Sequence, residues 1–391
     1  MKLRPYQQEA SNIAVKAMRE HRNGLIVIPT GGGKSLVIAD IAYRLEEPLL
    51  VFCPNKEILE QNVGKMGFYG VSDIAVYSAS LNSKMISKIT FATIGSVMNH
   101  KVQFDRFKYV IVDEAHLVNA KGGQYKEFIE SKNRTVLGLT ATPYRLDRGF
   151  NGGSILKFLT RTRPRVFDEL LYYVQISDLL NDGYLADLKY YDLTDITNFD
   201  ISRVRTNSTG ADYDDESLKQ EYTRIGYYDK LTTTVLRVMN PKSGKPRRGI
   251  LVFTKFIEEA DMLVRKLKAN GVSAAIVTGE TPLRERQEII RGFRGGEIDV
   301  VSNVGTLTTG FDYPELDTVI IGRPTRSLGL WYQMIGRIIR PHNGKDAWVV
   351  DLCGTYRRFG AVSDLKIDVE RPYTKLYCIK SKGIQLTNIE Y

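Results

Sequence analysis

Short runs of aliphatic and β-branched residues alternate along the chain with longer segments in which apolar residues recur at helical spacing. In the N-terminal part, turn-forming residues and then a helical pattern follow each run. The predicted strands are residues 24–28, 48–53, 88–92, 109–112 and 135–139. Strand–helix alternation of this kind predicts an α/β fold with a parallel sheet that helices cover on both faces.

The same alternation returns in the C-terminal half. The predicted strands are residues 249–254, 274–278, 300–303, 319–322 and 347–352, and the predicted helices are 258–270, 283–293 and 330–340. Between the halves the pattern weakens, and residues 206–215, which include acidic positions, could form a disordered loop. We therefore expect an N-terminal domain over residues 1–165, a connector over 166–239, a second domain over 240–360 and a tail over 361–391.

Composition narrows the class of protein. The 391 residues are 43% hydrophobic and 26% charged, as in ordinary globular proteins. No apolar run approaches the roughly 20 residues that span a bilayer, and the N-terminus lacks the apolar core of a signal peptide, so we expect a cytoplasmic protein with no membrane partner. Cys53, Cys353 and Cys378 are too widely separated to indicate a disulfide framework or a zinc site. The net charge of +10 favours a polyanionic partner, weakly by itself.

A glycine-rich segment, IPTGGGKS at residues 28–35, follows a predicted strand and precedes an apolar helical segment. Glycines let backbone N–H groups approach phosphate oxygens, and the helix N-terminus adds a positive dipole end. In such a loop the lysine reaches the β- and γ-phosphates and the serine hydroxyl binds Mg²⁺. The candidates for ATP contacts are Thr30, Gly31, Gly32, Gly33, Lys34 and Ser35, with Ser35 also a metal ligand. The alternative is an ordinary glycine-rich turn.

Two adjacent carboxylates, Asp113 and Glu114, begin the tetrapeptide DEAH directly after the predicted strand at 109–112. Adjacent carboxylates at a strand end can divide the work of hydrolysis. Asp113 would hold Mg²⁺, while Glu114 would orient and deprotonate the attacking water. Downstream of a phosphate-binding loop, this pattern predicts a nucleotide-hydrolysing site.

Together these motifs resemble those of the DEAH-box-type helicases and ATPases of superfamily 2, and the resemblance covers nearly the whole chain. It extends to the segments 3–7 (LRPYQ), 53–56, 91–95 and 138–143 of the first half, and 252–255, 277–280, 303–312 and 333–340 of the second. The stretches LRPYQQEA, GLTATPYRL, NDGYL and LTTGFDY are most similar to RadD-like DNA repair ATPases of bacteria and phages. The resemblance implies two tandem RecA-like domains with an ATP cleft between them, and ATP and Mg²⁺ as cofactors.

The resemblance also assigns roles to individual residues. It implies that Arg4 and Gln7 bind the nucleotide, Gln7 through the base, with Gly310 and Asp312 on the nucleotide from the second lobe. It implies catalytic roles for Gln333, Arg337 and Arg340, whose spacing would place them on one face of a helix. For contacts to the nucleic-acid backbone it implies Pro54, Asn55, Thr93, Thr254, Lys255, Thr278 and Thr308.

These motifs favour one function and leave two others open. The favoured hypothesis is an ATP-dependent DNA helicase or translocase acting on single-stranded, forked or branched DNA, with DNA-repair or replication proteins as further partners. The first alternative is an ATP-gated clamp or recruitment module that does not unwind. The second is an RNA helicase, because nothing in the motifs reports on a 2′-hydroxyl.

Overall fold

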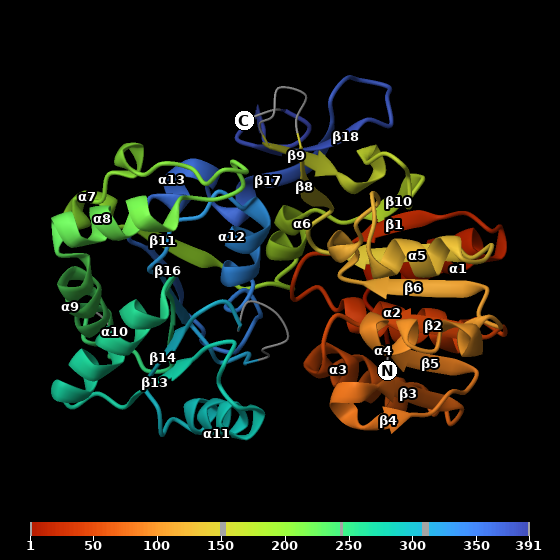
Figure 1. The fold of residues 1–391 in the computed structure, drawn as a ribbon, viewed down its shortest axis with the longest axis horizontal. Helices are drawn as coiled ribbons and strands as arrows, with labels where there is room; N and C mark the ends of the chain where they lie inside the picture. The colour runs from red at the N-terminus through yellow and green to blue at the C-terminus, as the bar shows by residue number, and fades with distance from the viewer. Residues whose placement is uncertain (1, 149–153, 243–244, 307–312, 390–391) are drawn as a thin grey trace. The chain divides into compact units, whose positions relative to one another are not determined.

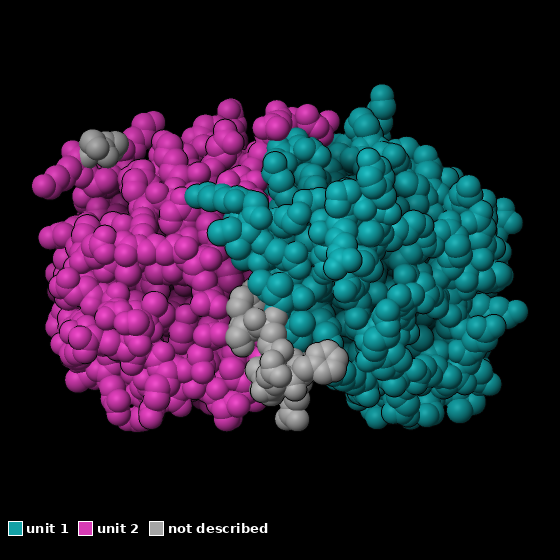
Figure 2. All heavy atoms as spheres, turned by 90° about the horizontal axis from the view of Figure 1, so that it is seen from above, with its two compact units in different colours: residues 1–149, 155–179, 366–390 teal, residues 150–154, 180–365, 391 magenta. Residues whose placement is uncertain are grey.

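The computed structural model describes residues 2–148, 154–242, 245–306 and 313–389. The chain forms two compact units (Figure 2). Unit 1 comprises residues 1–149, 155–179 and 366–390, and unit 2 comprises residues 150–154, 180–365 and 391. The expected connector is shared between the units, and most of the expected tail belongs to unit 1.

Unit 1 is built on an eight-stranded sheet in the order β10-β1-β7-β6-β2-β5-β3-β4 (Figure 1). Every neighbouring pair is parallel except β3 and β4. The five predicted strands are confirmed as β1 (Gly24–Val27), β2 (Leu49–Phe52), β5 (Ile89–Ala92), β6 (Tyr109–Asp113) and β7 (Thr135–Thr140). Strands at or near the sheet's edges, which the pattern did not single out, are β3 (Ile74–Ser78), β4 (Ser83–Lys84) and β10 (Glu169–Tyr173).

The helices of unit 1 pack as two groups. One group contains α1 (Pro5–Arg19), α2 (Lys34–Arg44) and α3 (Lys56–Met66), in which α2 contacts both neighbours. In the other group, α4 (Ile94–Met98) packs on α5 (Gln124–Glu130). Because β1, β2, β5 and β6 are buried at every position, their apolar residues leave no solvent-facing side.

Smaller elements lie wholly or mostly in unit 1. They are β8 (Tyr144–Arg148), β9 (Ser154–Phe158), α6 (Ile176–Asn181), β17 (Leu365–Val369), β18 (Tyr377–Ser381) and β19 (Ile384–Gln385). The last three form a sheet of their own. An ion pair of 2.9 Å between Arg161 and Glu370, and a 2.9 Å hydrogen bond from the Phe158 N–H to Asn388 Oδ1, fasten this C-terminal sheet to unit 1.

Unit 2 contains a second, fully parallel sheet in the order β11-β16-β15-β12-β14-β13. Its strands are β11 (Leu188–Asp192), β12 (Ile250–Phe253), β13 (Ala274–Val277), β14 (Val300–Asn303), β15 (Thr318–Ile321) and β16 (Ala347–Asp351). Its helices are α7 (Thr194–Thr197), α8 (Asp215–Ile225), α9 (Tyr227–Met239), α10 (Ile257–Ala269), α11 (Leu283–Arg294), α12 (Leu328–Ile335) and α13 (Thr355–Phe359). The five strands predicted in this half are confirmed, and β11 is an addition.

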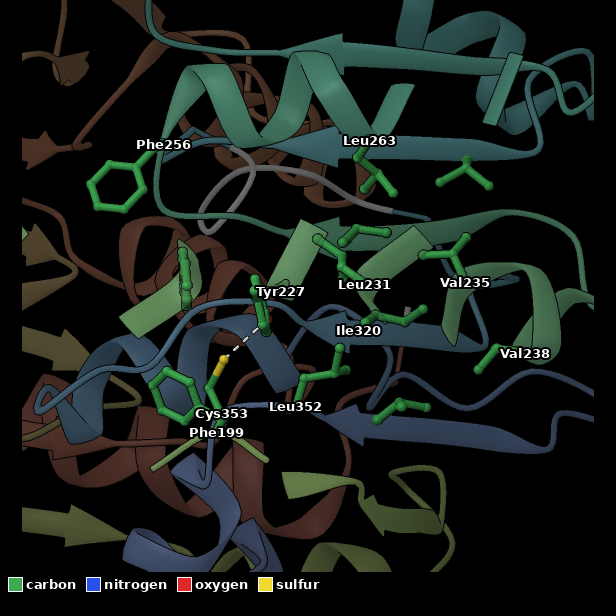
Figure 3. Packing of buried hydrophobic residues seen from close by; sticks show 14 of the residues in the cluster. Phe199, Tyr227, Leu231, Val235, Val238, Phe256, Leu263, Ile320, Leu352 and Cys353 are labelled. Atoms are coloured by element: carbon green, nitrogen blue, oxygen red, sulfur yellow. Dashed lines mark hydrogen bonds between the residues drawn. The ribbon is translucent and has the colours of Figure 1, made fainter. Parts of the chain in front are cut away.

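The core of unit 2 is a cluster of buried side chains in which α8, α9 and α10 pack on the sheet (Figure 3). Leu231 and Val235 of α9 lie in it with Leu263 of α10 and Ile320 of β15. The side chains of α9 that enter the core recur every three or four residues, as expected of an amphipathic helix.

One helix differs from its prediction. Residues 330–340 were expected to be helical, but α12 ends at Ile335. The N–H groups of Arg337 and Ile338 bond to carbonyls three residues back, which tightens the chain into a turn after Gly336. Pro341, which follows directly, does not favour helix in the residue before it. The expectation that Gln333, Arg337 and Arg340 share one face of a continuous helix is therefore wrong.

The acidic region is also ordered. Thr206 and Tyr213 form an antiparallel bridge, and the Asn207 N–H donates to the carbonyl oxygen of Asp212 at 2.9 Å. Asn207 Oδ1 accepts from the Ala211 N–H at 3.1 Å, closing a compact turn. This is a loop fixed by its own hydrogen bonds. Among the described residues, no helix has the length and apolarity needed to cross a membrane.

Candidate functional site

The glycine-rich loop joins β1 to α2 in unit 1. Gly31 and Gly33 have φ values of 82° and 83°, in the region that L side chains rarely adopt. A Cβ at Gly33 would lie 2.4 Å from Gln7 Nε2, and one at Gly32 would lie 2.7 Å from Ile28 Cγ2. The backbone therefore depends on glycine at these positions. α2 begins at Lys34, so the loop leads directly into a helix N-terminus.

Replacing Gly33 by alanine is expected to lower the stability of the folded protein by about 1–3 kcal/mol and to weaken ATP binding. The new Cβ would push against Gln7 and strain the backbone. Urea unfolding and fluorescent-nucleotide titration would measure the two effects. Gly70→Ala is a matched control, because Gly70 also has a positive φ (64°) but has no atom within 4 Å of the new Cβ. Equal ATP affinity for the two variants would contradict the expected role of the loop.

Asp113 ends β6, and its side chain is buried. Asn62 Nδ2 donates to Asp113 Oδ2 at 2.8 Å, and the Glu114 N–H donates to Oδ1 at 3.0 Å. Burial, assisted by the charge of Glu114, raises the pKa of Asp113 to about 6, against the lowering effect of Lys34. A cation would relieve this cost of a buried carboxylate, and carboxylate and hydroxyl oxygens suit Mg²⁺. Asp113 and Ser35 therefore fit the predicted metal role.

Glu114 connects the two motifs of unit 1. It adopts a left-handed backbone (φ 55°, ψ 53°), which is uncommon for a residue with a side chain and is found preferentially at functional sites. Its Oε1 lies 3.5 Å from Lys34 Nζ, and its Oε2 lies 3.4 Å from His116 Nδ1. Lys34 and Glu114, predicted independently from two motifs, are thus brought together in the fold.

His116 extends this arrangement to the segment after β7. Its Nδ1 lies 3.1 Å from Thr140 Oγ1 and 3.0 Å from Thr142 Oγ1. Burial lowers the pKa of His116 below its usual value, so the ring is mainly neutral at pH 7. His116 therefore connects Glu114, after β6, with Thr140 and Thr142, at and just after the end of β7.

Gln7 lies against the glycine-rich loop. Its Nε2 donates to the Gly32 carbonyl at 2.9 Å, and its Oε1 accepts from the Arg4 N–H at 3.0 Å. Tyr6 donates to the same carbonyl at 2.7 Å, and Arg4 Nη1 donates to the Tyr6 hydroxyl at 3.3 Å. Both polar atoms of the Gln7 side-chain amide thus already make hydrogen bonds within the protein. Tyr6 and Asn62 are contributors that the sequence did not reveal, because an isolated Tyr or Asn carries no pattern.

The nucleic-acid candidates of unit 1 lie where β2 and β5 end. Asn55 caps α3, with its Oδ1 accepting from the Ile58 N–H at 3.0 Å. Thr93 precedes α4, and its Oγ1 lies 2.9 Å from Ser96 Oγ. Both residues are partly exposed, as is Pro54. They share the carboxyl edge of the sheet with the glycine-rich loop, where ligands of parallel sheets collect.

The candidates of unit 2 differ in accessibility. Thr254 is fully buried, and its hydroxyl lies 3.3 Å from both Ser302 Oγ and the Asn303 carbonyl oxygen. Thr278 is also buried and accepts from the Glu280 N–H at 3.1 Å. Lys255 is partly exposed and makes ion pairs, which are described below. Thr308, Gly310 and Asp312 lie outside the described residues.

The three predicted catalytic residues of unit 2 lie on α12 and just beyond it. Gln333 is on the helix, and its carbonyl accepts from Arg337 Nε at 3.3 Å. Arg337 is buried. Burial, together with the charge of Arg294, lowers the pKa of Arg340 from its ordinary value. Their catalytic roles stay predictions.

Unit 1 places a glycine-rich loop beside an acidic strand end on a RecA-like sheet, and unit 2 contains a second sheet of the same kind. These features define a two-domain P-loop protein. Residues 1–145 match the family model "Type III restriction enzyme, res subunit", and residues 230–342 match "Helicase conserved C-terminal domain". The chain belongs to helicase superfamily 2.

Two curated relatives and one solved structure illustrate the similarity. "Putative ATP-dependent helicase IRC3" of Saccharomyces cerevisiae is 26% identical over 90% of this chain and 51% of its own length. "DNA 3'-5' translocase XPB2" of Sulfurisphaera tokodaii is 26% identical over 90% of this chain and 81% of its own length. The ATP-dependent Type ISP restriction-modification enzyme LlaBIII, solved bound to DNA, gives a TM-score of 0.64 at 18% identity, covering 90% of this chain and 27% of that one. The chain spans about half the length of the yeast relative.

Proposed function

We propose that the chain is an ATP-driven motor that hydrolyses ATP on binding DNA and uses the cycle to move along or remodel it. The observation that carries the proposal is the 3.5 Å pair between Lys34 and Glu114, which joins the phosphate-binding loop to the acidic strand end. Lys34 neutralises phosphate charge, and Glu114 accepts the proton of the attacking water. Asp113 and Ser35 are the residues that would hold Mg²⁺, and the ion would supply charge neutralisation.

DNA is the proposed polymer. The XPB2 relative is named a DNA translocase, and the LlaBIII structure contains DNA. The net charge of +10 suits a polyanion. Asn55 and Thr93 lie at the carboxyl edge of their sheet and offer polar groups to a backbone. The acceptor of the Asn55 amide is already used by the Ile58 N–H, so this amide is not free for a bidentate contact to a base. We infer binding that is largely independent of sequence, and a role in repair, recombination or replication follows from the resemblance alone.

ATP hydrolysis should be measured without polymer and with single-stranded DNA, duplex, forked DNA and RNA, using Glu114→Gln as the inactive control. We expect at least one DNA form to accelerate turnover more than RNA does, and the acceleration to fall with rising salt. Stimulation of hydrolysis by RNA alone would show that the polymer is RNA and not DNA. A hydrolysis rate that none of the polymers changes would contradict the proposed motor function.

A strand-displacement and translocation assay on the stimulating DNA separates the motor from the ATP-gated clamp. The motor should displace a bound roadblock or strand when ATP is supplied and should fail to do so with a non-hydrolysable analogue. DNA-stimulated hydrolysis without displacement or movement would favour the clamp.

A further inference from the structure

Asp212 of unit 2 is held as a bound anion would be. Its Oδ2 accepts from Arg323 Nη2 at 3.2 Å and lies 3.7 Å from Lys255 Nζ. Its Oδ1 accepts from the backbone N–H of Arg326 at 3.0 Å. A guanidinium, an ammonium and a backbone N–H converging on two oxygens form the kind of donor set that also binds phosphate.

The position of this donor set in the sheet is equally informative. Lys255 follows β12, and Arg323 follows β15, so both lie at carboxyl ends of neighbouring parallel strands. After β12 the chain adds β13 and β14 on one side of that strand. It then adds β15 and β16 on the other side. The gap between β12 and β15 is therefore the point at which strand order reverses, and in open α/β sheets ligands bind outside such a point.

The core next to the site holds Gly322, the residue before Arg323, in place. Tyr222 and Tyr227 are stacked with ring centroids 4.1 Å apart, and their hydroxyls donate to the Gly322 carbonyl at 3.1 and 2.7 Å. Figure 3 shows Tyr227 in this core, with its hydroxyl bonded to Cys353. A Cβ at Gly322 would lie 2.9 Å from the Phe253 carbonyl oxygen, so the end of β15 is held closely against β12.

The positive charges of Lys255 and Arg323 lie mostly away from solvent, so a nearby anion must compensate them. The side chains of Lys255 and Arg323 are only 17% and 12% exposed, and Asp212 is 22% exposed. Within the described residues, Arg323 Nε is buried with no hydrogen-bond partner. Glu259, also close to Arg323, is fully buried, and burial raises its pKa to about 8, so it carries little charge at pH 7. Asp212 is therefore the main counter-charge of Arg323, with Asp215, 3.1 Å from Lys255 Nζ, serving the lysine.

We propose that Lys255, Arg323 and the Arg326 N–H form a binding site for a backbone phosphate of the nucleic acid, which the Asp212 carboxylate occupies until a strand replaces it. The inference rests on the proposed function. It adds two residues to those predicted from the sequence and makes Asp212 an internal competitor. A phosphate cannot enter beside Asp212, because two anions would then share one pair of cations. Asp212 can leave by rotating its side chain, since its backbone is held separately by Asn207.

The test compares single-stranded DNA binding, by fluorescence anisotropy without nucleotide, for the wild-type protein and Asp212→Asn. The amide keeps the shape and can still accept from Arg326, but it loses the charge that holds it to the two cations. We expect about three- to tenfold tighter binding, because the open site becomes more populated. The slope of log affinity against log salt should stay within about 0.7 of the wild-type slope, the value for one phosphate on a single strand, because the same phosphate is bound in both proteins.

Two further variants make the result specific. Asp229→Asn removes the same charge from α9, where Asp229 pairs with Lys266 outside this site, and should leave the affinity close to wild type. Adding Arg323→Gln to Asp212→Asn should cancel the gain. Thermal unfolding verifies that each variant is folded. Equal affinities for Asp212→Asn and Asp229→Asn would overturn the proposal, as would a change in the KM for ATP without a change in DNA affinity, which would assign the site to a nucleotide phosphate.

A separate readout distinguishes failure of this inference from failure of the proposed function. If neither protein binds DNA and no polymer stimulates hydrolysis, the proposed function fails. Inorganic tripolyphosphate then tests the anion site directly. Greater thermal stabilisation of Asp212→Asn than of the wild type by this probe supports the site, and equal stabilisation of both overturns it.

Discussion

Replacing Glu114 by glutamine is expected to slow ATP hydrolysis about 10²–10⁴-fold while ATP binding is retained. The amide has the size of the carboxylate but cannot accept a proton from water. Lys34 would lose an anionic neighbour at 3.5 Å, which leaves its positive charge available to the phosphates. Steady-state hydrolysis and fluorescent-nucleotide titration measure the two quantities. The expected signature is a low kcat with unchanged or tighter nucleotide affinity.

Two comparisons make this result interpretable. Lys34→Ala should also abolish turnover but should weaken nucleotide binding, because the lysine is predicted to contact the phosphates in the ground state. Glu130→Gln removes a carboxylate from the exposed face of the same unit and should leave hydrolysis unchanged. Normal hydrolysis by Glu114→Gln would show that the acidic strand end is not the catalytic centre.

Replacing Arg337 by alanine is expected to reduce hydrolysis about 10³–10⁵-fold, the contribution of an arginine finger to phosphoryl transfer. We expect nucleotide affinity to stay within about tenfold, or roughly 1.4 kcal/mol. The physical reason is that such an arginine stabilises charge that develops in the transition state more than charge already present in ATP. Single-turnover hydrolysis and equilibrium binding should therefore be measured on the same preparation.

Arg337 is buried, so its removal could also destabilise unit 2. Thermal unfolding and Arg337→Lys, which keeps the positive charge, separate the two effects. Arg284→Ala provides the matched control, because the Arg284 side chain is 93% exposed on α11 of the same unit. A large loss of affinity with unchanged turnover would show that Arg337 binds the ground state and is not a finger.

The central strands of both sheets were predictable from sequence because they are buried on both faces. Strand β2 is a continuous apolar run with every residue buried. Edge strand β11 alternates between partly buried and exposed positions and carries Lys and Asp, so its apolar signal is too weak to stand out. The end of α12 was missed because Arg337, Ile338 and Ile339 continue the helical spacing, while the tightening after Gly336 depends on local hydrogen bonds.

For the candidate site, too, some features could be predicted from the sequence and others could not. Lys34 and Glu114 could be predicted as candidates because the geometry of phosphate chemistry restricts which residues follow which strand. The hydrogen bonds of Gln7 to Gly32 and Arg4 could not, since an amide can serve a base or a backbone equally well. The pairing of Asp212 with Arg323 joins residues 111 positions apart, and the sequence alone gives no signal for such a contact.

The course of the chain between the units has a topological consequence. The backbone leaves unit 1 after residue 179, builds unit 2 through residue 365, and returns to add the C-terminal sheet to unit 1. Residues 180–365 are thus an insertion anchored by two covalent connections, and cutting one of them does not release it. Removing the residues after 365 would leave the sheet of unit 2 intact but would take most of β17 and all of β18 and β19 from unit 1, together with the Glu370 partner of Arg161. Loss of the C-terminal residues would therefore alter the unit that contains the N-terminus of the chain.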